Sequence, residues 1–326
     1  MNILITGANG FVGRSLSKAL LRANHTVFGV TSRAGECLPG VKEWLCARRD
    51  FVDLAHVWQR DIPIDCVVHL ASRVHKRDEN RQQGAALLAQ YRETNVNGSV
   101  RVAQAAQAAG VRRLVFLSSI KALGDTEPGT SAHPWREDDV PHPCDPYGIS
   151  KREAEDALLE FSRNNLIEVV GLRPPLVYGP EVRANFLQLM RATASGWPMP
   201  LGGVTAKRSI IFVENLGDAI ALCCHHPAAS GHIFHVSDGQ DMTVGEMIRV
   251  LERGLGKRAR LLDVPLDWLT LAGRLSGRAD QIQKLTSPLR LDIHLIRRTL
   301  HWTPPHSVER GLMETAAWFQ LQRRGQ

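Results

Sequence analysis

The sequence has 326 residues, of which 44% are hydrophobic and 22% are charged, and its formal net charge is +7. This length and composition predict a soluble globular protein with a large core and a second lobe. No apolar run approaches the roughly 20 residues of a membrane span, and the chain opens directly on a strand-like segment, so we expect a cytoplasmic protein. The positive charge suits an anionic ligand, but no basic, aromatic-interleaved patch indicates nucleic-acid binding.

The chain begins with a short apolar strand, residues 1–6, which leads directly into a glycine-rich turn and then into an amphipathic helix over residues 14–23. A GxxGxxG pattern between a strand and a helix is the context that the dinucleotide fingerprint requires. The first glycine permits the tight turn, the second lets the backbone approach a pyrophosphate, and the third lets the helix pack on the strand. We therefore predict cofactor binding by Gly7, Gly10, Phe11, Val12 and Gly13.

The alternation of strands and helices continues to residue 173, with strands expected at 26–31, 44–47, 66–70, 113–117 and 168–173. Such alternation predicts a parallel sheet that is covered on both faces. After Pro174 the pattern changes to helices at 185–196 and 216–225 and strands at 209–213 and 233–236. The remainder is mostly helix, expected at 243–255, 266–275, 280–285, 292–300 and 308–323.

The predicted fold class is therefore α/β, with a Rossmann-type doubly wound parallel sheet and a smaller, mostly helical C-terminal substrate lobe. We expect residues 1–173 plus 209–238 to form the dinucleotide-binding domain. Residues 174–208 plus 239–326 are expected to form the lobe that binds a nucleotide sugar. Six cysteines lack paired CxxC spacing and are typical of buried or incidental thiols.

The run Cys223-Cys224-His225-His226 superficially suggests metal ligands. Adjacent residues on a helix point about 100° apart, so these side chains do not converge easily on one ion. We therefore interpret the run as the end of a buried helix and predict no metal site.

The segment from Asp145 to Lys151 places a phenol and an ammonium four residues apart where a helix begins. Pro146 is acceptable at a helix start, and the spacing puts Tyr147 and Lys151 on one helical face. A neighbouring cation favours phenolate, which predicts a tyrosine pKa below its ordinary value of about 10. These two residues are therefore candidates for proton transfer.

Eight segments in chain order resemble the extended short-chain dehydrogenases/reductases, the NAD-dependent epimerase/dehydratase superfamily of nucleotide-sugar epimerases, dehydratases and reductases. They are TGANGFVG at 6–13, HLAS at 69–72, NVNG at 95–98, FLSSIKALG at 116–124, YGISK at 147–151, LRPPLVYGP at 172–180, ANF at 184–186 and RSIIFVENL at 208–216. None is specific alone, but together they span about two-thirds of the chain in the right order.

The resemblance implies that Ser119, Tyr147 and Lys151 are the catalytic residues. Ser118 competes with Ser119, whose spacing to Gly124 fits the family better. Ser119 would hydrogen-bond the sugar oxygen, Tyr147 would transfer a proton, and Lys151 would hold the cofactor ribose. Further implied cofactor contacts are Asp50, Phe51, Leu70, Ala71, Asn95, Tyr147, Lys151 and Pro174. The implied substrate contacts are Arg73, Ser119, Lys121, Asn185, Phe186 and Arg208, with His75, Arg290 and Asp292 as weaker candidates.

Cofactor choice depends on the end of the second strand, which reads Val30-Thr31-Ser32-Arg33. An acid there would bind the adenine ribose and favour NAD, whereas a basic residue with small hydroxyls suits a 2′-phosphate. We therefore predict that NADP(H) is preferred and that Arg33 reads the phosphate. NAD(H) stays the alternative, because Arg33 equally suits stacking on adenine or facing solvent.

Related 4,6-dehydratases carry an acid pair directly after the catalytic hydroxyl, whereas here Ser119 is followed by Ile120 and Lys121. Related epimerases usually carry the acidic ribose anchor that this chain lacks. The resemblance thus favours an NADP(H)-dependent 4-ketoreductase, and is closest to bacterial reductases of UDP-2-acetamido-2,6-dideoxy-4-hexulose that make UDP-N-acetylquinovosamine for surface polysaccharide. Those relatives often read SSIKVNG, so Ala122 and Leu123 depart from them and leave the sugar open.

Two other functions stay open: a UDP-hexose or UDP-N-acetylhexosamine 4-epimerase with bound NAD, and a non-catalytic protein that senses the cofactor. Family analogy also implies a homodimer formed through residues 85–109 and 150–164.

Overall fold

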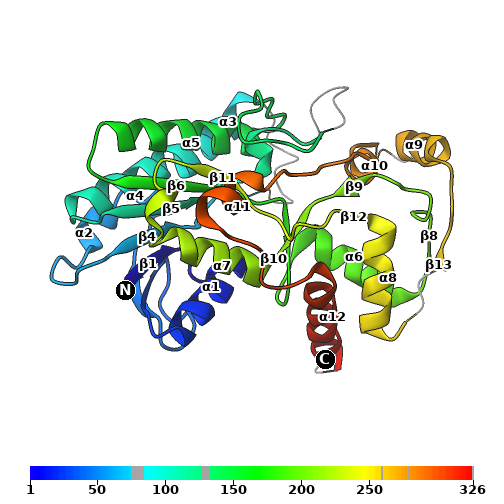
Figure 1. Ribbon diagram of the computed structural model, residues 1–326, viewed down its shortest axis with the longest axis horizontal. Coiled ribbons are helices and arrows are strands. Elements are labelled where there is room, and N and C mark those ends of the chain that lie inside the picture. The colour runs from blue at the N-terminus through cyan, green and yellow to red at the C-terminus, as the bar shows by residue number, and fades with distance from the viewer. Residues whose placement is uncertain (75–83, 127–132, 258–259, 276, 278, 325–326) are drawn as a thin grey trace.

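The computed structural model describes the chain except for residues 75–83, 127–132, 258–259, 276, 278 and 325–326, so His75 lies outside the described residues. In the described part, a parallel sheet of seven strands has the order β11-β6-β5-β4-β1-β2-β3 (Figure 1). The predicted Rossmann-type α/β fold is thereby confirmed. The strands are β1 Asn2–Thr6, β2 Thr26–Thr31, β3 Lys42–Leu45, β4 Cys66–His69, β5 Arg113–Leu117, β6 Glu168–Arg173 and β11 Ile233–His235.

The first strand lies at the point where the strand order reverses. Ile5 of β1 lies opposite Gly29 of β2 on one side and Val68 of β4 on the other, with parallel register on both sides. Ligands of open parallel sheets bind outside the carboxyl ends of the strands at such a switch point. The loops that follow β1, β2 and β4 are therefore placed to form one site.

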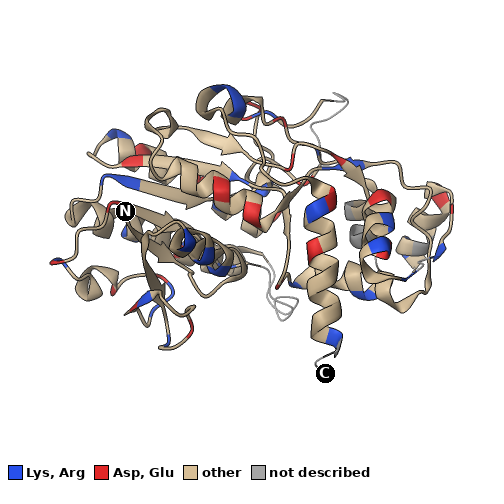
Figure 2. Cartoon of the chain, turned by 60° about the horizontal axis from the view of Figure 1, so that its bottom comes forward, with Lys and Arg blue, Asp and Glu red and all other residues tan. Residues whose placement is uncertain are grey.

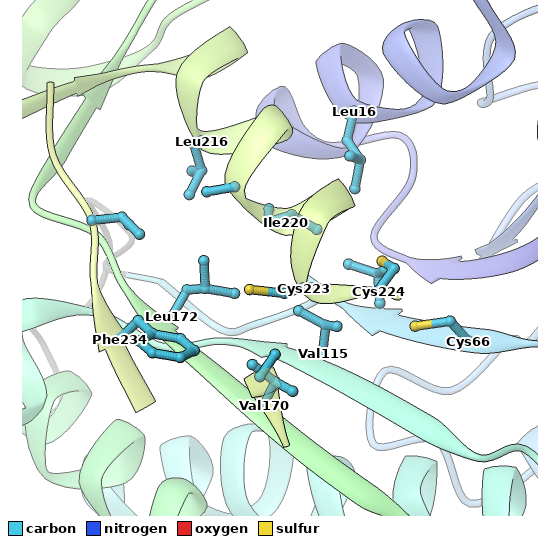
Figure 3. Close-up of a cluster of buried hydrophobic side chains, with 14 of the residues drawn as sticks. Leu16, Cys66, Val115, Val170, Leu172, Leu216, Ile220, Cys223, Cys224 and Phe234 are labelled. Carbon is cyan, nitrogen blue, oxygen red and sulfur yellow. The ribbon is translucent and has the colours of Figure 1, made fainter. Parts of the chain in front are cut away.

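Helices cover both faces of the sheet, as expected for buried parallel strands. On one face, α7 Val213–Cys223 packs beside α1 Phe11–Arg22. The apolar side chains of α7 point onto the strands (Figure 3). The other face carries α2 Leu54–Val57, α4 Gly98–Ala108 and α5 Pro146–Arg163. Cys66, Cys223 and Cys224 are buried free thiols in the first of these layers. Among the described residues, no group of His, Cys, Asp and Glu is arranged to hold a metal ion.

The helix that runs towards the site along residues 85–109 is interrupted. It consists of α3 Ala85–Arg92, a π-helical turn Glu93–Asn97 and α4. π turns inside helices are rare and are frequent at functional sites, because the extra residue changes where side chains point. Here it turns Asn95 into the protein interior, where the side chain is buried.

The smaller lobe is mostly helical, as the sequence predicts. Its helices are α6 Ala184–Ser195, α8 Val244–Leu255, α9 Leu266–Leu275, α10 Ala279–Thr286 and α12 Val308–Arg324. Its short strands pair as β7 Leu176–Tyr178 with β10 Ile210–Phe212, β9 Lys207–Arg208 with β12 Met242–Thr243, and β8 Pro198–Met199 with β13 Arg260–Leu261. Two 3-10 turns, Ile120–Ala122 after β5 and Pro227–Ala229 after α7, belong to the larger lobe.

Between α10 and α12 the chain returns to the large sheet. Helix α11 His294–Leu300 packs against β11, and Ile293, Ile296 and Trp302 join the core beneath that strand. The two lobes are thus joined by several crossings of the chain. Lys and Arg are spread over both lobes (Figure 2), and no described helix is long and apolar enough to cross a membrane.

Candidate active site

Ser119, Tyr147 and Lys151 come together where β5 ends and α5 begins. The Ser119 hydroxyl and the Tyr147 phenol share a hydrogen bond. The Lys151 ammonium lies 6.0 Å from the centre of the Tyr147 ring and donates to the Leu117 carbonyl over 2.8 Å. The three predicted catalytic side chains therefore share one site at the carboxyl edge of the sheet.

The start of α5 is fixed by its cap. Asp145 has extended backbone, and its side chain accepts a hydrogen bond from the Gly148 amide over 2.7 Å, while Pro146 occupies the first helical position. An aspartate cap followed by proline is a strong helix-start signal. The cap sets the first turn of α5, and with it the direction of the Tyr147 side chain.

Burial controls the protonation of both groups on α5. Burial raises the pKa of Tyr147 to about 12, the hydrogen bond from Ser119 opposes this rise, and the negative charge of Asp145 adds to it. Burial also lowers the pKa of Lys151 to about 7, against the opposing effect of Glu155. The expectation of a lowered tyrosine pKa is therefore wrong, because the burial of the phenol itself outweighs the groups that favour phenolate. Tyr147 holds its proton at neutral pH.

Asn95 connects the loop after β4 to α5. Its side-chain oxygen accepts hydrogen bonds from the Arg73 amide over 2.7 Å and the Ser72 hydroxyl over 3.1 Å, and its amide group donates to the Ser150 hydroxyl over 2.9 Å. Both the side-chain oxygen and the side-chain nitrogen of Asn95 therefore form hydrogen bonds to other groups of the protein. Asn95 therefore supports the site by holding these two elements together.

The neighbouring Ser118 points away from Tyr147 and into a buried ionic network. Its hydroxyl donates to Glu155 over 2.5 Å, and Arg173 donates to both oxygens of the same carboxylate over 2.9 and 2.7 Å. All three residues are buried. Because the Ser118 hydroxyl is committed to Glu155, Ser119 is the better candidate for contact with a substrate.

The glycine turn forms a cradle that side chains would fill. A Cβ on Gly7 would lie 3.0 Å from the Ala71 amide nitrogen, one on Gly10 would lie 3.1 Å from the Gly7 carbonyl, and one on Gly13 would lie 2.2 Å from that carbonyl. Gly10 caps α1 without any side-chain hydrogen bond, and no acidic residue occupies the first turn. The free amide groups of such a helix start suit a pyrophosphate, so these residues fit a dinucleotide cofactor.

A cavity of about 370 Å³ extends from this cradle along the carboxyl edge of the sheet. Its wall includes six of the predicted contacts, namely Gly7, Gly10, Phe51, Leu70, Ala71 and Arg73. The wall residues are all described. The predicted cofactor contacts that do not belong to this wall are Phe11, Val12, Gly13, Asp50, Asn95, Tyr147, Lys151 and Pro174. Ser32 is part of the wall, whereas Arg33 beside it is exposed and lies outside the wall.

The model of the NAD dependent epimerase/dehydratase family matches residues 3–237, which is more than half of the chain. The chain belongs to this family. A UDP-glucose 4-epimerase of Vibrio cholerae is 38% identical over 99% of this chain and 97% of its own length. A GDP-6-deoxy-D-mannose reductase of Pseudomonas aeruginosa is 25% identical over 95% of this chain and 94% of its own. The crystal structure of UDP-glucose 4-epimerase with UDP-glucose from Thermotoga maritima has a TM-score of 0.78 at 22% identity, covering 99% of this chain and 100% of that one.

The predicted substrate residues of this epimerase/dehydratase-family chain fall into two groups. Lys121 forms ion pairs with Asp145 and, over 3.1 Å, with Asp125. Burial lowers the pKa of Arg208, and the negative charge of Asp125 opposes this lowering. Arg208 donates to the Ser287 carbonyl over 2.6 Å. Lys121 and Arg208 thus lie around the same aspartate, where the two lobes meet.

The other predicted contacts are more scattered. The Arg73 guanidinium lies 5.5 Å from the centre of the Tyr91 ring, which in turn lies 6.3 Å from that of Tyr147. Asn185 is exposed at the start of α6, but the Phe186 side chain is buried in the lobe core, so its only free groups for a ligand are on the backbone. The backbones of Arg290 and Asp292 pair with Trp135 over 2.8 Å each.

Two arginines in the cavity wall did not enter the sequence prediction. Arg48 and Arg49 follow β3, which pairs with β2, and they line the cavity together with Ser32. Arg48 also forms a 2.5 Å ion pair with Asp50, whose pKa is lowered mainly by this contact. The sequence does contain a signal for these residues, namely two adjacent arginines shortly after the third strand. That strand ends at the same edge of the sheet as the glycine turn, so residues after it can reach the cofactor.

Proposed function

We propose that this family member is an NADPH-dependent 4-ketoreductase of a nucleotide sugar, with a UDP-linked 2-acetamido-2,6-dideoxy-4-hexulose as its substrate, for surface polysaccharide synthesis. The observation that carries the proposal is the composition of the cavity wall beyond the glycine turn. Among the described residues this wall contains Ser32, Arg48 and Arg49 but no Asp or Glu. A hydroxyl and two guanidinium groups suit a ribose 2′-phosphate, whereas an acid would repel it.

The protonation of Tyr147 supports the reducing direction. When bound, the nicotinamide cofactor supplies the hydride. Tyr147, which is protonated at neutral pH, donates its proton to the sugar oxygen, and Ser119 holds that oxygen by a hydrogen bond. Lys151, whose pKa is about 7, then takes or returns a proton beside the tyrosine and contacts the ribose.

The cofactor assignment is tested by replacing each arginine separately. In Arg48→Ser and Arg49→Ser, the ratio of kcat/KM for NADPH over NADH should fall by about tenfold or more, because a charge-assisted hydrogen bond contributes about 1.5–3 kcal/mol. Arg33→Asp provides the third comparison. A fall in that ratio only for Arg33→Asp would return the phosphate contact to Arg33, and an unchanged ratio in all three variants would contradict NADP(H) preference.

A UDP-hexose 4-epimerase is the second candidate, and the 38% identity to the Vibrio cholerae enzyme favours it. The two functions differ in how the cofactor is held. An epimerase keeps its nicotinamide through the reaction cycle, whereas a reductase releases it in every turnover. Nicotinamide that stays bound to the purified protein through gel filtration would favour the epimerase, and its loss on dilution is what the reductase proposal requires.

A non-catalytic cofactor sensor is the third candidate. The assembled Ser119, Tyr147 and Lys151 favour an enzyme. Tyr147→Phe removes the transferable proton without removing the ring, and we expect turnover to fall by about 10²–10⁴-fold. A variant with the turnover of the parent protein would support the sensor.

We also propose a homodimer formed through the helices along residues 85–109 and α5. These helices pack side by side, and Arg92 and Glu153 form an ion pair of 2.6 Å between them. Two such helices from each copy would build a four-helix contact. One chain has a mass of 36.1 kDa, and sedimentation equilibrium should give twice this value. A monomer at micromolar concentration would contradict this proposal.

A further inference from the structure

Helix α9 is apolar on two opposite sides, and only one side is covered. Leu269 and Gly273 face the lobe and are buried. Trp268, Leu271 and Leu275 are 70%, 54% and 81% exposed. Their spacing of three and four residues puts them on one helical face, opposite the buried one. A surface helix normally carries polar residues on its outer face, so this outer stripe is unusual.

Other exposed apolar residues lie at the same end of the smaller lobe. Strand β8 pairs with β13 in parallel, so Trp197, before β8, and Leu262, after β13, lie at opposite ends of this short strand pair. Leu262 and Leu266, the first residue of α9, are each 48% exposed, and Trp197 is 76% exposed. In Figure 1, β8, β13 and α9 all lie at the end of the molecule farthest from the N-terminus, with α9 above the two strands. We call Trp197, Leu262, Leu266, Trp268, Leu271 and Leu275 the apolar tip.

The segment of the sequence that contains α9 is also basic. Residues 257–290 contain seven Lys or Arg and three Asp, a net charge of +4 out of +7 for the whole chain. Within this segment Lys257, Arg260 and Arg274 are exposed, as are the acids Asp263 and Asp267. Single exposed leucines are ordinary, but six exposed apolar residues at one end of a lobe, three of them on one face of α9, indicate an interaction surface.

We propose that the apolar tip binds the surface of an anionic lipid bilayer. Amphipathic segments of this composition lie in the membrane interface, with tryptophan and leucine among the acyl chains and Lys or Arg beside the lipid phosphates. Helix α9 has 10 residues, too few to span a bilayer, which needs about 20. The tip would therefore rest on the membrane and leave the rest of the protein in water.

Charge favours a bilayer over a second copy of the chain as the occupant. In a two-fold dimer the same patch meets itself, so the exposed Lys257, Arg260 and Arg274, which outnumber the exposed Asp263 and Asp267, would face their own copies across the interface. Like charges brought together in this way oppose association. Anionic lipid headgroups supply the opposite charge over the same area.

The test uses the full-length protein and sedimentation with vesicles. We expect the protein to bind vesicles of phosphatidylcholine with phosphatidylglycerol, to bind pure phosphatidylcholine more weakly, and to be released by high salt. The triple variant Trp268→Ser, Leu271→Ser, Leu275→Ser should lose about tenfold or more in partitioning. The matched control is Leu166→Ser with Leu321→Ser, whose leucines are 96% and 68% exposed elsewhere on the surface, and it should bind as the parent does.

A second readout locates the contact. Trp44, Trp58, Trp135 and Trp302 are at most 6% exposed and Trp318 is half-buried. Quenching by brominated acyl chains should therefore act on Trp197 and Trp268, and Trp268→Phe should remove part of it. Equal partitioning of the triple variant and the control, with both variants retaining the parent's thermal midpoint, would overturn the proposal. So would a dimer without vesicles that only the triple variant dissociates, since a second copy would then be the occupant.

Discussion

Two glycines in helices should respond oppositely to alanine, because at only one of them would the added methyl group clash with a backbone atom. Gly148 lies in the first turn of α5, and a Cβ there would be 2.4 Å from the carbonyl oxygen of Lys121. Gly217 lies in α7, where a Cβ would meet the Leu16 Cα at 3.9 Å, an ordinary contact. Alanine in a helix is otherwise favoured over glycine by about 0.5–1 kcal/mol.

Gly148→Ala should move the first turn of α5 away from the turn that carries Ser119 by about 1 Å, the shortfall from a normal contact distance. Overpacking of this kind costs about 1–3 kcal/mol, which exceeds the gain in helix propensity. A displacement of about 1 Å between reacting groups costs roughly 100-fold in turnover. We therefore expect Gly148→Ala to lose stability and activity, and Gly217→Ala to gain stability and keep its activity.

Urea denaturation and steady-state turnover, measured on both variants and the parent protein, test this expectation. The comparison isolates the contact with Lys121, because both substitutions add the same methyl group to a buried position in a helix. If Gly148→Ala is as stable and as active as Gly217→Ala, the close approach of α5 to the Ser119 turn is not what positions Tyr147.

Three further outcomes are expected. Folding lowers the pKa of Lys151 from 10.5 to about 7, so the unfolded chain binds more protons between these values and the parent protein should gain stability as the pH rises through them. Lys151→Met should lack this rise and should be more stable than the parent at pH 6. Urea midpoints of both proteins at pH 6 and pH 9 test this. Ser119→Ala should lower turnover by about tenfold or more with little change in stability. Ser118→Ala should mainly lower the urea midpoint, because Glu155 then lacks one of its hydrogen-bond donors. The reverse pattern would assign the substrate contact to Ser118. Lys121→Met should leave two carboxylates facing each other and lower the thermal midpoint, while Lys121→Arg should restore it, and no difference between the two variants would exclude a role for the charge.

The features that the sequence predicted are those set by local pattern. The glycine turn needs only Gly7, Gly10 and Gly13 between a strand and a helix, and the start of α5 needs only a cap and Pro146. The alternation of short apolar segments with helices was sufficient for the parallel sheet, because strands buried on both faces require helices on both sides.

The features that the sequence left open depend on tertiary contacts. The pKa of Tyr147 is set by how deeply α5 packs, and the spacing to Lys151 contains no information on burial. The π-helical turn at Asn95 adds one residue to a helix that is otherwise regular in sequence. Arg48 and Arg49 enter the cavity wall only because β3 ends at the same edge as the glycine turn. Each of these required the position of a neighbouring element.

The most direct test of the proposed function compares two reactions of the same purified protein. One sample receives NADPH and a UDP-linked 2-acetamido-2,6-dideoxy-4-hexulose, and loss of nicotinamide absorbance is followed. The other receives UDP-glucose or UDP-N-acetylglucosamine without added cofactor, and the C4 epimer is sought. We predict rapid NADPH oxidation in the first sample, abolished by Tyr147→Phe, and no epimer in the second. Epimer formation without NADPH oxidation would contradict the reductase and establish the epimerase in its place.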